Sequence, residues 1–129
     1  MERPRHNGLR HLALNARNLD AMKRFYVELL GFEVEWEPDP DNVYLSSGVD
    51  NLALHRAPPG GPAGGALDHF GLIVSGADDV DRWAAFLENR GVTLDARPKT
   101  HRDGARSCYV SDPDGNKIQI IHHPPISHR

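Results

Sequence analysis

The stretch HLAL at residues 11–14 opens a pattern that the chain repeats as HFGL at residues 69–72. In both copies an amphipathic segment follows and ends at a glycine, Gly31 in the first copy and Gly91 in the second. The two histidines are 58 positions apart and the two glycines are 60 apart, so the copies differ by about two residues. We therefore expect two similar half-domains that each contribute one imidazole to a site where they meet.

Length and composition restrict the class of protein. The 129 residues correspond to one domain, and a formal net charge of −3 argues against nucleic acid or an anionic membrane as a partner. Cys108 is the single cysteine, which excludes an internal disulfide and fits a reducing compartment. The N-terminus has no apolar targeting segment, and no stretch has the ~20 apolar residues of a membrane span. We expect a cytoplasmic chain.

The first half-domain is expected to have the order strand, helix and three strands. Asn18 is a plausible N-cap, and Gly31 stands where a left-handed C-cap is needed. The helical apolar stripe comprises Leu19, Met22, Phe25, Tyr26 and Leu29. The expected strands span residues 9–15, 32–36, 43–46 and 51–55, with turns at 38–42 and 47–50. This is a βαβββ unit.

The second half-domain is expected to repeat that order. Its strands span residues 68–74, 92–96, 105–111 and 117–122, and the last two form a hairpin around the turn at 112–116. Asp78 is expected to cap the helix, with Val80, Trp83, Phe86 and Leu87 turned inward. We expect a single domain over residues 1–129, with modules at 9–56 and 67–123 and a Pro/Gly-rich linker at 57–66.

Strand alternation indicates which side chains share a face. Large apolar residues alternate with His11, His69 and Gln119 and should face the helices. The three polar side chains should therefore point to the opposite face of the sheet. The same rule places Ala53, His55 and Tyr109 on the face away from the helices. Polar groups that converge in an apolar cup are typical of a ligand site.

Four motifs resemble the vicinal oxygen chelate superfamily, which includes glyoxalase I, extradiol dioxygenases, fosfomycin-resistance enzymes and bleomycin-resistance proteins. They are RHLAL at 10–14, FY at 25–26 with LGF at 30–32, DHFG at 68–71 and DPDGN at 112–116. The resemblance implies an α+β fold in which two βαβββ modules form one curled, U-shaped mixed sheet around a cavity. It also implies a homodimer, with modules paired within a chain or between two chains.

The resemblance further implies a divalent metal ion held by a histidine from each module and a glutamate on the last strand. In this sequence the histidines are His11 and His69, and the glutamate position is Gln119. A fourth ligand position found in some members falls at Ala53. Imidazole and amide ligands suit Zn, Fe, Ni, Co or Mn, so the identity of the metal stays open.

Gln119 changes the expected chemistry, because an amide oxygen can bind a metal but has no negative charge and cannot act as a general base. Both glyoxalase-type isomerisation and extradiol cleavage use a carboxylate at this position. Other residues would then supply proton transfer or orientation, and the candidates are His55, His101 and Tyr109.

Each candidate also has a structural interpretation. His11 and His69 could line a cavity without metal, and Gln119 could anchor a water molecule. His55 could be a partly exposed strand-end residue, His101 a solvent-exposed residue of the loop at 99–104, and Tyr109 a sheet-packing residue. The C-terminal His122, His123 and His128 are expected to have no catalytic role.

Three functions fit this sequence. The first is a metal-dependent isomerase, lyase or ring-cleavage enzyme acting on a small oxygen-chelating substrate. The second is a metal-free ligand- or drug-binding protein similar to bleomycin-resistance proteins, for which few aromatic residues and a net charge of −3 give weak support. The third is a sensor or structural subunit, suggested by Ala53 and Gln119.

Overall fold

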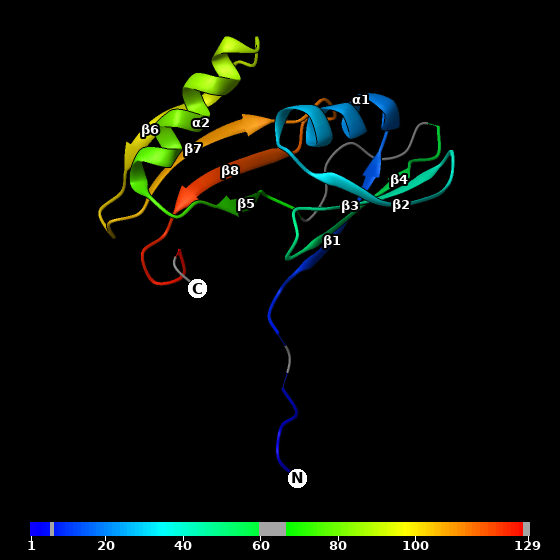
Figure 1. The fold of residues 1–129 in the computed structure, drawn as a ribbon, viewed down its shortest axis with the longest axis horizontal. Helices are drawn as coiled ribbons and strands as arrows, with labels where there is room; N and C mark the ends of the chain where they lie inside the picture. The colour runs from blue at the N-terminus through cyan, green and yellow to red at the C-terminus, as the bar shows by residue number, and fades with distance from the viewer. Residues whose placement is uncertain (6, 60–66, 128–129) are drawn as a thin grey trace. The chain divides into compact units, whose positions relative to one another are not determined.

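Two compact units make up the chain. The computed structural model describes residues 1–5, 7–59 and 67–127, and the units are Met1–Gly61 and Pro62–Arg129 (Figure 1). Most of the expected linker at 57–66 lies outside the described residues. Each unit has its own helix and its own four-stranded mixed sheet, which confirms the α+β fold with two βαβββ modules.

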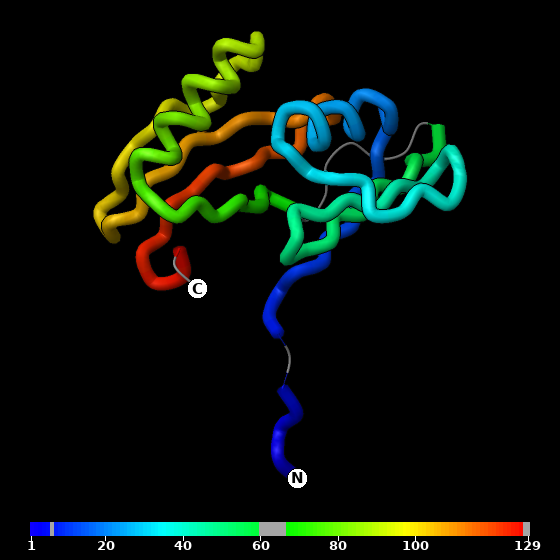
Figure 2. Tube along the Cα trace, in the orientation of Figure 1, coloured from blue at the N-terminus to red at the C-terminus, as the bar shows by residue number. Residues whose placement is uncertain are grey.

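Unit one contains a sheet with strand order β1-β4-β3-β2. Its elements are β1 (His11–Ala16), α1 (Leu19–Arg24), η1 (Phe25–Leu29), β2 (Glu33–Asp39), β3 (Asn42–Ser46) and β4 (Asn51–Arg56). Strand β1 pairs with β4 in parallel, and the tube in Figure 2 shows the two running together, whereas the other two pairings are antiparallel.

Unit two repeats this topology with strand order β5-β8-β7-β6. Its elements are β5 (Phe70–Ile73), α2 (Ala77–Asn89), β6 (Leu94–Thr100), β7 (Arg106–Ser111) and β8 (Lys117–His122). Strands β5 and β8 are parallel, and helix α2 packs against β6, β7 and β8 (Figure 1). His69 was expected inside the first strand of this unit but directly precedes β5.

The first helix contains a π-turn that the sequence pattern did not indicate. Asn18 caps it as expected, and its side chain accepts a hydrogen bond from the Ala21 N–H. The helix then widens, and the Leu30 N–H donates to the Phe25 carbonyl at 3.2 Å, five residues back. The extra residue rotates the apolar stripe, so Leu30 is buried and the expected Leu29 is only half-buried.

The second helix begins earlier than expected and buries a narrower stripe. Gly76 is the N-cap, not Asp78, and Asp79 accepts a hydrogen bond from the Gly76 N–H. The buried residues Val80, Ala84 and Leu87 follow i, i+4, i+7 spacing.

Phe86 was predicted to face inward and is instead exposed. At 100° per residue it lies about 130° from the middle of the buried stripe. Trp83, also expected inward, is half-buried, and its ring meets the ring of Phe86 edge to face at 5.7 Å.

The outer strands β2 and β6 are both longer than expected. They were expected to end at Trp36 and Ala96, before the turn at 38–42 and the loop at 99–104, and both instead continue through a proline, Pro38 or Pro98. An edge strand tolerates proline, since one side of its backbone needs no partner. Both strands pair with register shifts, and strand β6 reduces the expected loop around His101 to a tight turn before β7.

Arg106 and Cys108, two residues apart on β7, share the face that packs against α2. Cys108 is buried among apolar residues, and this burial raises the pKa of its thiol to about 11. Arg106 donates two hydrogen bonds to Asp81 of α2, and these bonds hold the pKa of that carboxyl below its ordinary value. They also tie the helix to the sheet.

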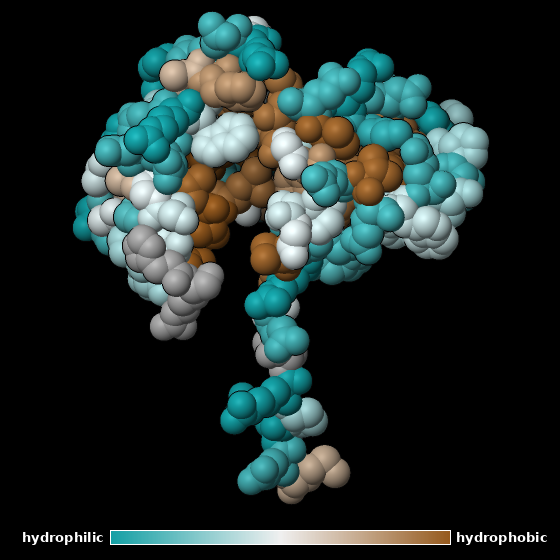
Figure 3. Space-filling model, in the orientation of Figure 1, coloured by the Kyte–Doolittle hydropathy of each residue, from teal (hydrophilic) through white to brown (hydrophobic). Residues whose placement is uncertain are grey.

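No helix among the described residues is long and apolar enough to cross a membrane. Residues 1–5 extend away from the sheet of unit one, and their side chains are largely hydrophilic (Figure 3).

The turn at residues 112–116 forms as expected, around a buried carboxylate. Asp112 is 4% exposed and accepts hydrogen bonds from the backbone N–H groups of Asp114 and Asn116 and from the Asn116 side chain. Gly115 adopts a φ of 87°, which favours glycine.

Replacing Asp112 with alanine should lower the free energy of unfolding by about 1–3 kcal/mol, because it removes the acceptor of three part-buried N–H donors. Chemical denaturation followed by circular dichroism measures the change. Pro113→Ala in the same turn, where the side chain is exposed, is the control and should change stability by less than about 0.5 kcal/mol. Equal stabilities for the two variants would contradict this account of the turn.

Candidate functional site

His11 lies on the face of the first sheet that points away from the helix. Leu14 and Ala16 of the same strand are buried, so alternation directs His11 to the opposite, open face. The His11 Nδ1 lies 2.7 Å from the Asn51 Oδ1 on the parallel neighbour β4. The Asn51 Nδ2 in turn donates to the Glu35 Oε2 at 3.0 Å. A chain of three polar side chains therefore crosses the open face.

Aromatic side chains cover another part of this face. Trp36 stacks on Tyr44 with a centroid distance of 5.2 Å, and the ring of Tyr44 meets the ring of His55 edge to face at 5.8 Å. His55 is fixed by a 2.6 Å hydrogen bond between its Nδ1 and the Asn42 Oδ1.

The strand geometry separates His55 from His11. Asn51 pairs with His11, and His55 lies four residues further along the same strand, which corresponds to about 13 Å of extended chain. This separation is several times a hydrogen-bond distance, so His55 cannot bond to an atom that is bound to His11. His55 and His11 are therefore too far apart along the sheet to share one ligand atom.

Unit two brings His69, Tyr109 and Gln119 together. Ile118 and Ile120 are buried on the helix side, so Gln119 lies on the open face, directly opposite Tyr109 in the ladder. The rings of His69 and Tyr109 meet edge to face at 5.5 Å. The His69 Nδ1 lies 2.6 Å from the Asp68 Oδ2.

Lys117 adds a positive charge to this group. It precedes Gln119 by two residues on β8, and its ammonium lies 5.8 Å from the centre of the Tyr109 ring. The His69 hydrogen bond first, and then the charges of His69 and Lys117, hold the pKa of Asp68 below its ordinary value.

His101 reaches the same unit through the turn between β6 and β7. Its Nε2 lies 2.8 Å from the Ser107 Oγ, and Ser107 is buried two residues before Tyr109 on β7. Two residues correspond to about 7 Å of strand. The His101 ring therefore lies next to Ser107, about one residue pair along β7 from Tyr109.

Ala53 and Gln119 occupy matching positions in the two sheets. Ala53 pairs with Tyr44 and lies opposite the second residue after His11. Gln119 pairs with Tyr109 and lies opposite the second residue after His69. Ala53 is fully buried and has no donor atom, so this position offers a ligand only in unit two.

The histidine of each unit, taken by itself, has an arrangement compatible with metal binding. His11 and His69 each have Nδ1 engaged with an oxygen, which leaves Nε2 available, and engagement of the other ring nitrogen is typical of metal-binding histidines. Gln119 offers an amide oxygen. Within the described ranges, no group of three His, Cys, Asp or Glu side chains is arranged to hold a metal ion.

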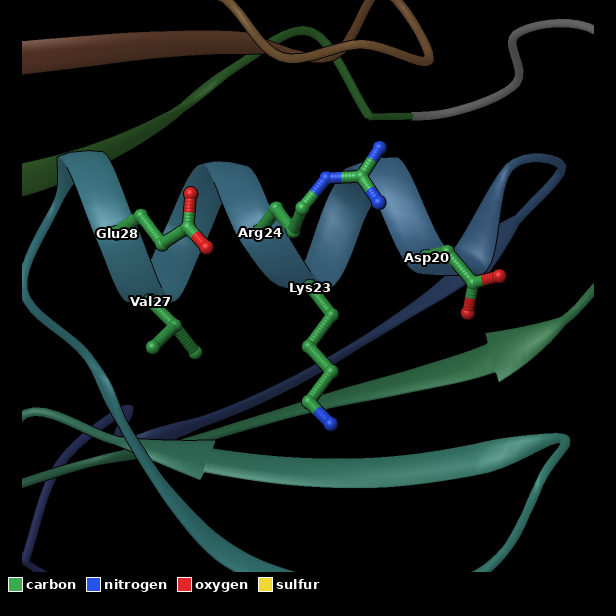
Figure 4. Close-up of a pocket in the computed structure, with 5 residues that line it drawn as sticks. All are labelled: Asp20, Lys23, Arg24, Val27 and Glu28. Carbon is green, nitrogen blue, oxygen red and sulfur yellow. The ribbon is translucent and has the colours of Figure 1, made fainter.

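Two surface depressions lie on the helices, away from these residues. One, of about 330 Å³, is lined by Asp20, Lys23, Arg24, Val27 and Glu28. In Figure 4 Lys23 extends from the helix toward the strands, where it forms an ion pair with Glu37 of β2. The other is lined by Asp79, Arg82, Trp83 and Phe86 on α2.

Sequence reasoning missed four side chains in these groups: Glu35, Asn51, Asp68 and Lys117. Lys117 shares the parity of Gln119, so alternation could have identified it. Asp68 directly precedes a candidate ligand. Asn51 shares the parity of Ala53 and His55, and Glu35 alternates with Val34, so alternation could have placed both on the open face. Their contacts with each other and with His11 depend on how the strands pair.

Comparison with known proteins shows a consistent similarity. Residues 8–120 match the family model described as "Glyoxalase/Bleomycin resistance protein/Dioxygenase superfamily". Biphenyl-2,3-diol 1,2-dioxygenase 3 of Rhodococcus globerulus is 28% identical over 120 residues, which cover 87% of this chain and 61% of that protein. The chain thus spans about three-fifths of the length of this curated relative.

Solved structures show the same fold. A lactoylglutathione lyase from Agrobacterium tumefaciens superposes with a TM-score of 0.76 at 24% identity, covering 91% of this chain and 94% of that chain. A superfamily member from Sphaerobacter thermophilus superposes with a TM-score of 0.71 at 25% identity, covering 92% of this chain and 98% of that chain.

The carboxyl group of Asp68 should titrate below its ordinary pKa of 3.8. Because its pKa is lowered in the folded state, its contribution to stability is present above pH 3.8 and is lost as the pH falls through the lower, folded-state pKa. NMR titration of the carboxyl carbon measures this. His69→Gln should move the midpoint up toward 3.8, whereas His55→Gln should not. A wild-type midpoint at or above 3.8 would contradict the contact.

Proposed function

Because the chain belongs to the Glyoxalase/Bleomycin resistance protein/Dioxygenase superfamily, we propose that it is a divalent-metal-dependent enzyme acting on a small organic substrate that chelates the ion through oxygen. The observation that supports this most directly is the pair of histidines at the start of the two units, His11 as the first residue of β1 and His69 directly before β5. Each has one ring nitrogen held by an oxygen and the other available.

The ligands in this proposal are His11, His69 and Gln119. When bound, the ion would act as a Lewis acid and would orient two substrate oxygens. The proposal requires unit one and unit two to supply their ligands to one ion, either within a chain or between the two chains of a homodimer. The metal would be Zn, Fe, Ni, Co or Mn, since all accept imidazole nitrogen.

Residues around Gln119 provide orientation and charge. The Tyr109 hydroxyl can donate a hydrogen bond to a substrate oxygen, and the Lys117 ammonium can stabilise negative charge that develops on it. His101, held by Ser107, can exchange a proton with a substrate that extends along β7. His55 would contact the far end of a longer substrate beside Tyr44.

The reaction class follows from what Gln119 cannot do. An amide cannot remove a proton from carbon, so any isomerase or lyase reaction here needs its base elsewhere, with His101 as the candidate in unit two. Ring cleavage would proceed with a neutral third ligand. The dioxygenase relative makes aromatic diols the first substrates to test.

Protein purified without chelator should contain close to one divalent ion per chain by elemental analysis. His11→Ala and His69→Ala should each lose most of it, because two remaining ligands hold the ion weakly. His123→Ala, a histidine outside both groups, is the control and should keep its metal.

If His11→Ala and His69→Ala retained the wild-type metal content, the assigned ligands would be wrong. No binding by wild type after incubation with Zn, Fe, Ni, Co and Mn would remove the metal-dependent proposal.

A second candidate, a metal-free ligand-binding protein, is favoured by one observation. The stacked pair Trp36 and Tyr44 lies on a strand pair rich in acidic residues, and Trp36 is 60% exposed. The acidic side chains of β2 are Glu33, Glu35, Glu37 and Asp39. Of these, Glu37 is paired with Lys23 of α1 on the helix side, whereas Glu35 lies on the face of Trp36. A planar cation could stack on such a surface.

In this second case, a planar aromatic cation such as ethidium should quench the tryptophan fluorescence of metal-free protein with saturable binding. Trp36→Ala should abolish the saturable component, and Trp83→Ala on α2 should not. Identical titrations for the two variants would exclude Trp36 as the binding surface.

A further inference from the structure

From the geometry of unit one we infer that Glu35 and Asn51 are a positioning pair that fixes the His11 ring with its Nδ1 protonated and its Nε2 available as a ligand. This concerns residues that neither the sequence pattern nor the family motifs single out. It rests on the proposed function only for the use made of Nε2, since the arrangement itself exists without a metal.

Alternation after Val34 places Glu35 on the open face, and a β-bulge brings its neighbour Trp36 to the same face. Val34 pairs with Leu45 and Trp36 pairs with Tyr44, so two steps along β2 match one step along β3. Glu35 is the extra residue. Leu45 is buried on the helix side and Tyr44 is on the open side, so regular alternation would let only one of Glu35 and Trp36 reach the open face. The bulge lets both reach it, and Glu35 bonds there to Asn51.

The direction of the hydrogen bonds follows from the chemistry of the three groups. A carboxylate only accepts, so the Asn51 amide must turn its NH₂ toward Glu35. Its carbonyl oxygen then faces the imidazole at 2.7 Å, and this oxygen can only accept. The His11 Nδ1 therefore bears the proton, and in the neutral ring Nε2 holds the lone pair.

Unit two supports this assignment, because its histidine also has an oxygen acceptor at Nδ1, supplied by a different residue. Extending the β5 and β8 register by one residue places Lys117 opposite His69, where unit one has Asn51. Lysine has no acceptor, so it cannot bond to an imidazole N–H. There His69 uses the preceding Asp68 instead, at 2.6 Å. Each histidine thus has an oxygen acceptor on Nδ1, supplied from a different position.

The matching bulge of unit two also contains a carboxylate, Asp95, which bonds to a serine and not to a partner of a histidine. Leu94 pairs with Val110 and Ala96 with Tyr109, so Asp95 is the extra residue there. Its side chain accepts a hydrogen bond from the Ser111 hydroxyl. Asp95 therefore provides a matched control for Glu35: an acidic residue in an equivalent bulge without a path to a histidine.

The test measures the tautomer of His11 in metal-free protein by long-range proton–nitrogen NMR, at a pH where the imidazoles are neutral. Wild type should show His11 protonated at Nδ1. Asn51→Leu should shift His11 toward the Nε2–H tautomer, and Glu35→Ala should shift it in the same direction by less. Glu35→Gln, which keeps an acceptor, should retain the wild-type tautomer, and Asp95→Ala should leave it unchanged.

A second measurement separates this inference from the proposed function. Titration with Co²⁺ should show affinity lowered about 10- to 100-fold in Asn51→Leu and unaltered in Asp95→Ala. A shifted tautomer in Asn51→Leu with no Co²⁺ binding by wild type would support the positioning pair and overturn the metal proposal. An unshifted tautomer in both Asn51→Leu and Glu35→Ala would overturn the positioning pair, whatever the metal affinity.

Discussion

The parallel pairing of the first and last strands of each unit is the constraint on which the other features depend. Because β1 pairs with β4 and β5 with β8, a residue at the start of the unit lies beside one near its end. Alternation then assigns one face to the helix and the other to polar side chains. The histidines, Gln119 and their hydrogen-bond partners take their places from this pairing, and the helices supply the apolar cover that fixes the register.

The two units use this frame with different side chains. Unit one surrounds its histidine with an amide, a carboxylate and an aromatic pair, whereas unit two has an aspartate, a lysine, a tyrosine and a glutamine. The matching positions of Ala53 and Gln119 indicate that only one unit retains a ligand atom at that point of the sheet. Two copies of one topology therefore contribute unequally.

Departures from the predicted elements have local physical causes. The π-turn at Phe25–Leu29 inserts a residue and moves the buried position from Leu29 to Leu30. Helix α2 starts at Ala77 because Asp79 can bond back to the Gly76 N–H, so Asp78 is not needed as a cap. Strands β2 and β6 continue through Pro38 and Pro98 because an edge strand has no partner on one side. In each case a tertiary or capping contact outweighed a local preference.

The sequence by itself determined the repeat, the order of elements, the turn at 112–116 and the face on which His11, His69 and Gln119 lie. These follow from period-two alternation, capping residues and turn chemistry, all of which act within a few residues along the chain. Only the tertiary structure decided that Asn51 lies beside His11, that Glu35 bonds to Asn51 and that His55 is about 13 Å further along β4 from the residue that pairs with His11. Strand register and bulges arise between segments far apart in the chain, so no local pattern contains them.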